Sequence, residues 1–251
     1  MRARARLVAE ADGRGGTRLS TVYGEPPLLP RRTGRQHHPT AAEVHLVGGA
    51  AGPLGGDDLR VDIRVGPGAH LIVRTVAASL AQPSHPPAPS ALTITAKVGA
   101  AATLDWLPEP TVATAGCDHL NRSIVDLEDG ASLRWREELV AGRHAEPSGD
   151  MRLETTVRYA GRTILRHDLG IGPRAKGWQA MLDRAAGTVL LVGPEALATR
   201  AINRMPLANA PAALVSATGP DARTVRAALD EGAANTRAHD PDAKPGNWRK
   251  G

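Results

Sequence analysis

The sequence contains no phenylalanine, and aromatic residues make up only 2% of its 251 residues. Aromatic side chains supply much of the buried area in most protein cores, so valine, leucine, isoleucine and alanine must fill this interior. Each of these residues buries less surface than an aromatic ring does. The composition therefore favours a broad, thin, layered structure over a deep globule.

Cysteine is nearly absent as well, and the single residue, Cys117, excludes an internal disulfide framework. No CxxC, HExxH, GxxxxGK[ST] or GxSxG pattern occurs, which removes the commonest zinc, nucleotide and hydrolase motifs. No apolar run approaches the ~18 residues of a membrane span. The charged segment Met1–Glu10 does not resemble a signal peptide. We therefore expect a soluble, cytoplasmic protein.

Lysine is rare too, so the net charge of +5 comes mainly from arginine. A basic surface for nucleic acid is one interpretation. However, Arg60, Arg64 and Arg152 alternate with apolar residues and share their segments with Asp62 and Glu154. This pattern is typical of the solvated face of a sheet crossed by ion pairs. Single-strand binding would also need stacking aromatics, so we favour the sheet face.

One short phrase occurs three times, at Val65–Leu71, Val98–Leu104 and Leu127–Leu133. Each copy is an apolar residue, a small turn, an alanine and a return to leucine, and the copies start 33 and 29 residues apart. Alternating apolar and polar residues flank the turns, most clearly over Leu59–Val65. We predict tight turns between paired strands, and hence a mainly β, two-layered scaffold of stacked hairpins.

Two α-helices are expected near the C-terminus. One is predicted over Glu195–Asn203, after Pro194, and the other over Asp221–Glu231, where an apolar stripe follows a Pro-Asp start. Beyond Gly232 the sequence is polar and contains two further prolines, which is typical of disorder. The predicted organisation is a β-scaffold domain over residues 1–232 and a disordered tail over residues 233–251.

Few side chains with metal-binding chemistry lie close together in the sequence. Cys117 and His119 would share one face of an extended segment and could bind Ni²⁺ or Zn²⁺, but we favour a buried thiol beside a surface imidazole. Glu137 would lie with Leu133 and Trp135 on the apolar face of its strand. A carboxylate there needs a partner or a water-filled space, unless a β-bulge exchanges the two faces.

Three longer phrases resemble one protein family. They are Leu54–Leu71, which begins with a Gly-Gly-Asp turn, Leu104–Thr111, which reads Leu-Asp-Trp-Leu-Pro-Glu-Pro-Thr, and Glu138–Arg143, which fits Glu-x-x-x-Gly-Arg. All three are similar to signatures of the urease accessory protein UreD family, called UreH in some organisms. The resemblance runs from about residue 4 to residue 231.

The resemblance implies a non-enzymatic role in assembling the nickel centre of urease. Proteins of this family are scaffolds that bind apo-urease and the accessory protein UreF, and through UreF they recruit the GTPase UreG. A water-filled passage through such a scaffold would convey Ni²⁺ without any tightly bound cofactor. The resemblance makes Asp57 and Glu138 the candidate transient nickel contacts, with Arg143 as an ion-pair partner for such a carboxylate.

Two other classes of function remain as alternatives. A β-sandwich enzyme could use Asp57, Glu109 or Glu138 as acid and base, although no sequence-adjacent pair supports it. A basic, nucleic-acid-binding β protein is disfavoured by the missing aromatics and the interspersed carboxylates.

Overall fold

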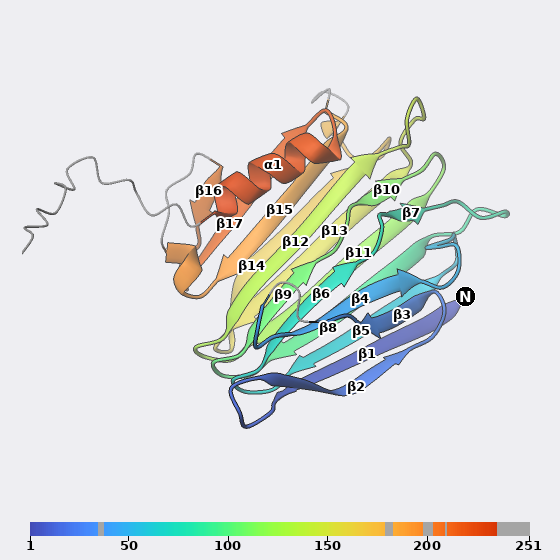
Figure 1. Ribbon diagram of the computed structural model, residues 1–251. Coiled ribbons are helices and arrows are strands. Elements are labelled where there is room, and N and C mark those ends of the chain that lie inside the picture. The colour runs from blue at the N-terminus through green and yellow to red at the C-terminus, as the bar shows by residue number, and fades with distance from the viewer. Residues whose placement is uncertain (35–37, 179–182, 198–202, 209, 235–251) are drawn as a thin grey trace, which may run out of the picture.

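The computed structural model describes residues 1–34, 38–178, 183–197, 203–208 and 210–234, and Figure 1 shows that strands dominate it. A seven-stranded sheet has the order β14-β13-β11-β8-β5-β1-β2. Its strands are β1 (Arg2–Ala11), β2 (Thr17–Gly24), β5 (Asp58–Val65), β8 (Ser90–Val98), β11 (Asp118–Leu127), β13 (Asp150–Tyr159) and β14 (Arg162–Ile171).

A second, ten-stranded sheet has the order β16-β17-β15-β12-β9-β6-β4-β3, with β10 paired to β12 and to β7. Its strands are β3 (Leu28–Arg32), β4 (Ala42–Gly48), β6 (His70–Thr75), β7 (Ser79–Ala81), β9 (Thr103–Leu107), β10 (Thr111–Ala113), β12 (Ser132–Ala141), β15 (Ala185–Val192), β16 (Arg204–Pro206) and β17 (Ala212–Gly219). The mainly β prediction is therefore confirmed.

The chain winds back and forth between the two sheets. Strands β5, β8 and β11 run parallel to one another in the first sheet, and β6, β9 and β12 run parallel in the second. The prediction of stacked hairpins is wrong, because each repeated phrase joins strands of different sheets and forms a corner of a solenoid-like stack. Hairpins occur at the margins, where β1 pairs with β2 and β13 with β14.

The three corners have the same backbone geometry. In each, the amide of the alanine that ends the turn donates to a carbonyl three residues earlier, at 3.1 Å in all three copies. The residue before that alanine is left-handed, with φ of 67° at Gly68, 53° at Ala101 and 73° at Gly130. Backbone hydrogen bonds also join the corners, since the amide of Gly68 donates to the carbonyl of Ala100. Each copy of the repeated phrase therefore forms a corner of the same geometry, which can stack on the next corner through backbone hydrogen bonds.

Small aliphatic side chains fill the space between the sheets, as the composition requires. On β5, Leu59, Val61, Ile63 and Val65 are all buried, in agreement with the predicted period of two. Two of the rare aromatics, Trp106 and Trp135, lie in the same interior. Trp106 and Trp135 are register partners on β9 and β12, and their rings stack with centroids 5.2 Å apart.

The C-terminal part departs from the parallel winding. Strands β15 and β17 pair antiparallel beyond β12, and helix α1 (Ala222–Ala233) packs on β12, β15 and β17 (Figure 1). Gly187 on β15 permits this close packing, because a Cβ there would lie 2.9 Å from side-chain atoms of both Glu138 and Leu229. The helix begins at Asp221, whose carboxylate accepts a hydrogen bond from the amide of Thr224 at 2.8 Å.

One of the two predicted helices is confirmed. Helix α1 matches the prediction over Asp221–Glu231, and it is the single α-helix in the part of the chain that the structure describes. The segment predicted as Glu195–Asn203 begins instead as a 3₁₀-helix, Pro194–Leu197, and residues 198–202 lie outside the described residues. Most of the predicted disordered tail, residues 235–251, also lies outside them.

Candidate functional site

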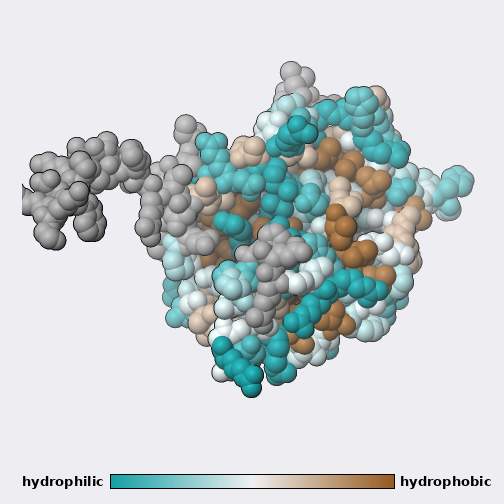
Figure 2. Space-filling view, in the orientation of Figure 1, coloured by the Kyte–Doolittle hydropathy of each residue, from teal (hydrophilic) through white to brown (hydrophobic). Residues whose placement is uncertain are grey.

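A cavity of about 540 Å³ lies between the sheets at the end away from the repeated corners. Leu59, Val61, Leu92 and Ile94 line it from β5 and β8. The opposite wall includes residues 75–80, which lead from β6 into β7, and Trp106 of β9. Figure 2 shows apolar side chains exposed on this face of the molecule, near β4, β7 and β10. The polar residues of the lining include Glu109, Asn121, Glu137 and Glu138.

Glu137 points into the interior from β12 and is 7% exposed. Its carboxylate accepts a hydrogen bond from the hydroxyl of Ser123 at 2.7 Å and another from the hydroxyl of Thr155 at 2.6 Å. The interpretation of Glu137 as a carboxylate on the apolar face is confirmed. It has hydrogen-bonding partners and also adjoins a cavity, which are the two ways in which such a buried group can be accommodated.

These three residues form a polar layer through the interior, in which Ser123 and Thr155 are register partners on β11 and β13. One apolar cluster lies on the corner side of this layer and includes Val125 and Trp135. A second lies on the other side and includes Leu139 and Leu153. The apolar alternation is therefore broken at the same depth on three strands, and hydrogen bonds join the three breaks.

Beyond the cavity lining, polar side chains continue along β11 from Asn121 to His119, which is 2% exposed. Its Nδ1 lies 2.8 Å from the hydroxyl of Ser90, and its Nε2 lies 2.8 Å from Oδ1 of Asn121. Burial lowers the pKa of His119 from its ordinary value of 6.5, because desolvation disfavours the imidazolium. In the neutral ring, Nε2–H donates to Asn121 and Nδ1 accepts from Ser90.

Glu138 faces the opposite side of β12, beneath α1. Its side chain is 2% exposed, and both carboxylate oxygens accept from Nε of Arg226, at 2.8 and 2.9 Å. Arg226 also reaches Glu109, with nitrogen–oxygen distances of 3.3 and 3.4 Å. Nε of Arg136 approaches Glu138 to 3.4 Å. Two arginines therefore share one buried carboxylate.

Asp57 is buried but is not among the residues that line the cavity. Its Oδ1 lies 2.6 Å from the ammonium group of Met1, and its Oδ2 accepts from the amide of Leu54 at 2.9 Å. Its charge still acts on the cavity wall, since it favours protonation of His119 against the effect of desolvation. Within the described residues no hydrogen bond or ion pair joins Asp57 to Glu138.

Three other sequence interpretations can be compared with the structure. Arg143 pairs with Glu146 at 2.9 Å, so its expected pairing with a candidate nickel carboxylate is wrong. Cys117 is a buried thiol, as expected, and burial raises its pKa to about 11. The neighbouring imidazole of His119 is buried rather than at the surface, because its odd-numbered position on β11 faces the interior.

Sequence reasoning identified Glu109, Glu137 and Glu138 and considered His119 together with Cys117, but it missed Asn121, Ser123 and Thr155. The missing signal was the parallel register. Each of these residues interrupts an apolar alternation, and only the register of β11 and β13 places the interruptions beside one another. Among the described residues, no group of three or more His, Cys, Asp or Glu side chains has a geometry that could hold a metal ion.

Comparison with known proteins identifies the family. The family model described as "UreD urease accessory protein" matches residues 1–249. The chain belongs to the UreD family. No described helix is long and apolar enough to cross a membrane.

Relatives of the UreD family cover nearly the whole chain. A "Urease accessory protein UreD" of Parafrankia sp. is 43% identical over an alignment of 263 residues. The alignment covers 92% of this chain and 87% of that protein. "Urease accessory protein UreD 3" of Streptomyces griseus is 43% identical and spans 92% of this chain and 95% of its own. The UreD of Frankia alni is 37% identical and spans 91% of both. The family resemblance seen in the three sequence phrases is thus confirmed.

Proposed function

We propose that this chain is a non-catalytic accessory protein of urease maturation. Its relatives are named urease accessory proteins and match it from end to end, which supports the same role here. The proposal includes the partners implied by the sequence resemblance: apo-urease and UreF bind the scaffold directly, and UreG joins through UreF. It also keeps the expected location in the cytoplasm.

We further propose that Ni²⁺, the cargo of this process, passes through the cavity between the sheets. The observation that carries the proposal is the buried carboxylate of Glu137, which lines the cavity together with the amide of Asn121. An interior carboxylate attracts a cation into an otherwise largely apolar space. Oxygen ligands hold a borderline ion such as Ni²⁺ less tightly than thiolates would, so the cation can leave again.

Glu138 and Asp57 are the other proposed contacts on this route. Glu138 is among the residues that border the same cavity, but its carboxylate lies on the α1 side of β12, where Arg226 and Arg136 share its charge. A passing cation must compete with two guanidinium groups there, which favours a brief contact over a stable site. Asp57 would act at longer range, since its charge influences His119 next to the cavity wall.

Urease expressed with its accessory proteins in a host lacking its own urease tests the proposal. We expect Asp57→Ala, Glu137→Gln and Glu138→Ala to lower the nickel content and activity of the purified urease. Glu231→Ala removes an exposed carboxylate of α1 and should leave both unchanged. Circular dichroism and thermal unfolding of each variant separate loss of the route from loss of the fold.

Two outcomes would contradict different parts of the proposal. Normal nickel content with all three substitutions combined would exclude the cavity as the route. Normal urease activation without this chain would exclude the accessory role itself.

A further inference from the structure

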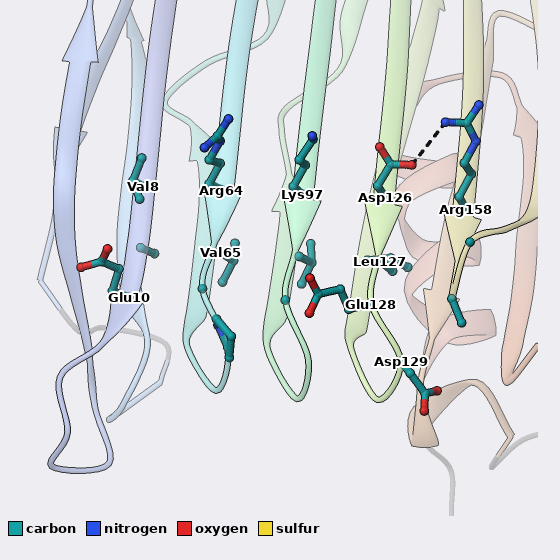
Figure 3. Close-up of a pocket in the computed structure, with 17 residues that line it drawn as sticks. Val8, Glu10, Arg64, Val65, Lys97, Asp126, Leu127, Glu128, Asp129 and Arg158 are labelled. Atoms are coloured by element: carbon teal, nitrogen blue, oxygen red, sulfur yellow. Dashed lines mark ion pairs between the residues drawn. The ribbon is translucent and has the colours of Figure 1, made fainter.

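The outer face of the seven-stranded sheet carries a groove of about 880 Å³ next to the repeated corners (Figure 3). A row of charged side chains crosses its upper part. Arg64 on β5, Lys97 on β8, Asp126 on β11 and Arg158 on β13 are successive register partners across the parallel strands. Carboxylates of the corner ends, including those of Glu10, Glu128 and Asp129, lie below this row in Figure 3.

Every carboxylate in the groove is already engaged with another group. Asp126 pairs with Arg158 at 3.6 Å, Glu10 pairs with Arg18, Glu128 accepts from the amide of Ala100 at 2.9 Å, and Asp129 accepts from the hydroxyl of Tyr159 at 3.0 Å.

Arg64 and Lys97 differ from the other charged residues that line the groove, all of which have a partner. Within the described ranges, neither has a carboxylate at ion-pair distance, although both are exposed. They lie directly opposite each other on neighbouring strands. Like charges in this position repel and destabilise a sheet. Asp126 is the register partner of Lys97 on its other side, but it pairs with Arg158, so no ion pair within the described structure offsets the repulsion between Arg64 and Lys97.

The charge imbalance extends over one half of the sheet. Strands β1, β5 and β8 contain six arginine or lysine residues and three aspartate or glutamate residues. Strands β11, β13 and β14 contain five of each. Arg64 and Lys97 thus belong to a region of net positive charge, whereas the other half carries equal numbers of cationic and anionic side chains.

We propose that the face formed by β1, β5 and β8, centred on Arg64 and Lys97, binds an acidic segment of a partner protein. A carboxylate between the two side chains would accept from both and remove their mutual repulsion. The groove lining includes Gly66 and Gly99, which have no side chains to obstruct an entering segment. Charge complementarity of this kind chiefly accelerates association and sets the orientation of a complex.

The groove fits an acidic protein segment better than a nucleic acid. None of its lining residues is aromatic, so bases would find no stacking platform. The carboxylates of Glu10, Glu128 and Asp129 lie on the corner side of Arg64 and Lys97. They would repel a continuous phosphate backbone, whereas a peptide can place acidic residues over the cations and neutral or basic residues over the carboxylates.

Fluorescence anisotropy with labelled poly-glutamate, and with duplex DNA as a second probe, tests the proposal on the full chain. We expect the double variant Arg64→Glu/Lys97→Glu to weaken poly-glutamate binding by at least about tenfold, since rim charges act directly on charge-driven association. The matched control, Arg122→Glu/Arg152→Glu, makes the same change in net charge on the balanced half, at residues that do not line the groove. We expect it to retain most of the affinity.

Thermal unfolding of both variants verifies that they are folded. Equal losses in the two variants would overturn the proposal, because affinity would then follow net charge alone. Absence of poly-glutamate binding by the unchanged protein would also overturn it. So would tighter binding of duplex DNA that is lost in Arg64→Glu/Lys97→Glu, since the face would then be a nucleic-acid site.

Discussion

Arg226 of α1 binds both carboxylate oxygens of Glu138 on β12, with Nε at 2.8 and 2.9 Å. The two residues are 88 positions apart in the sequence. This contact fixes the C-terminal helix on the outer surface of the ten-stranded sheet. It also brings opposite charge to a carboxylate that is 2% exposed and would otherwise be costly to bury.

Removing the Arg226 guanidinium should therefore destabilise the protein. We expect Arg226→Met to lower the free energy of unfolding by about 3 kcal/mol, because it leaves the buried Glu138 charge with Arg136 as its remaining partner. Urea denaturation measures the change. Adding Glu138→Gln to Arg226→Met should recover part of it, since no buried charge is then left.

The matched control is Arg152→Met, which breaks an ion pair with Asp168 at the surface. Exposed pairs contribute little to stability, so this variant should unfold nearly as the unchanged protein does. An equally small effect of Arg226→Met would mean that the buried pair does not stabilise the position of α1.

The stability that the polar layer around Glu137 contributes should depend on the two hydroxyl groups that donate to the carboxylate. Thr155→Val keeps the side-chain shape but removes one of the two hydrogen bonds to the carboxylate. We expect the free energy of unfolding to fall by about 2 kcal/mol, because hydrogen bonds to buried charged groups are worth more than neutral ones.

Chemical denaturation also measures this change, with Ser20→Ala as the control. The Ser20 hydroxyl makes one long contact of 3.4 Å on an exposed strand, so its removal should have little effect. A stabilising effect of Thr155→Val would indicate that the Glu137 carboxylate does not need the donors assigned to it.

At the repeated corners, two substitutions should change the free energy of unfolding in opposite directions. Ala101 has φ of 53°, a left-handed conformation that a non-glycine residue adopts at a cost. Ala101→Gly should raise the free energy of unfolding by about 0.5–1 kcal/mol. Gly130→Ala, at the equivalent position of the next corner, should lower it by a similar amount.

Space does not complicate the second substitution, because a Cβ on Gly130 would approach no atom closer than 3.8 Å. Thermal unfolding of both variants measures the effects. Changes of the same sign would show that the two corners are not equivalent in backbone energy.

The buried His119 should make stability depend on pH. Its pKa in the folded protein is lowered, so below about pH 6.5 the unfolded chain takes up a proton that the folded protein does not. The free energy of unfolding therefore falls as the pH falls through this range, by at most about 1.4 kcal/mol per pH unit from this group. Above the unfolded pKa the contribution is constant.

Urea denaturation between about pH 5 and pH 7 compares the unchanged protein with His119→Gln. We expect His119→Gln to lose the part of the pH dependence of the unfolding free energy that His119 contributes. The control His85→Gln, at an exposed loop position, should retain it. Equal slopes for the unchanged protein and His119→Gln would contradict the assignment of a neutral, buried imidazole.

The sequence predicted strands well because their signal is local. Alternation over Leu59–Val65 identifies both the strand and its buried face, and the structure agrees. The connection between strands could not be obtained in the same way. A tight turn after Val65 is compatible with a hairpin or with a corner between sheets, and the choice depends on parallel pairing with strands about 30 residues away.

The candidate site shows the same division. Glu137 was identified from its own strand, because a carboxylate at an apolar position is visible in the alternation. Thr155 and Ser123 have no such signal alone, since a small hydroxyl residue is common in strands. Their role follows only from the register that places them around Glu137.

The central claim is that this UreD-family chain conveys nickel to urease through the cavity that contains Glu137. The most direct test is the nickel content per active site of urease purified from cells that express this chain either unchanged or with Glu137→Gln. We predict near-complete occupancy with the unchanged chain and a clear deficit with a folded Glu137→Gln variant. Equal occupancy in the two preparations would contradict the claim.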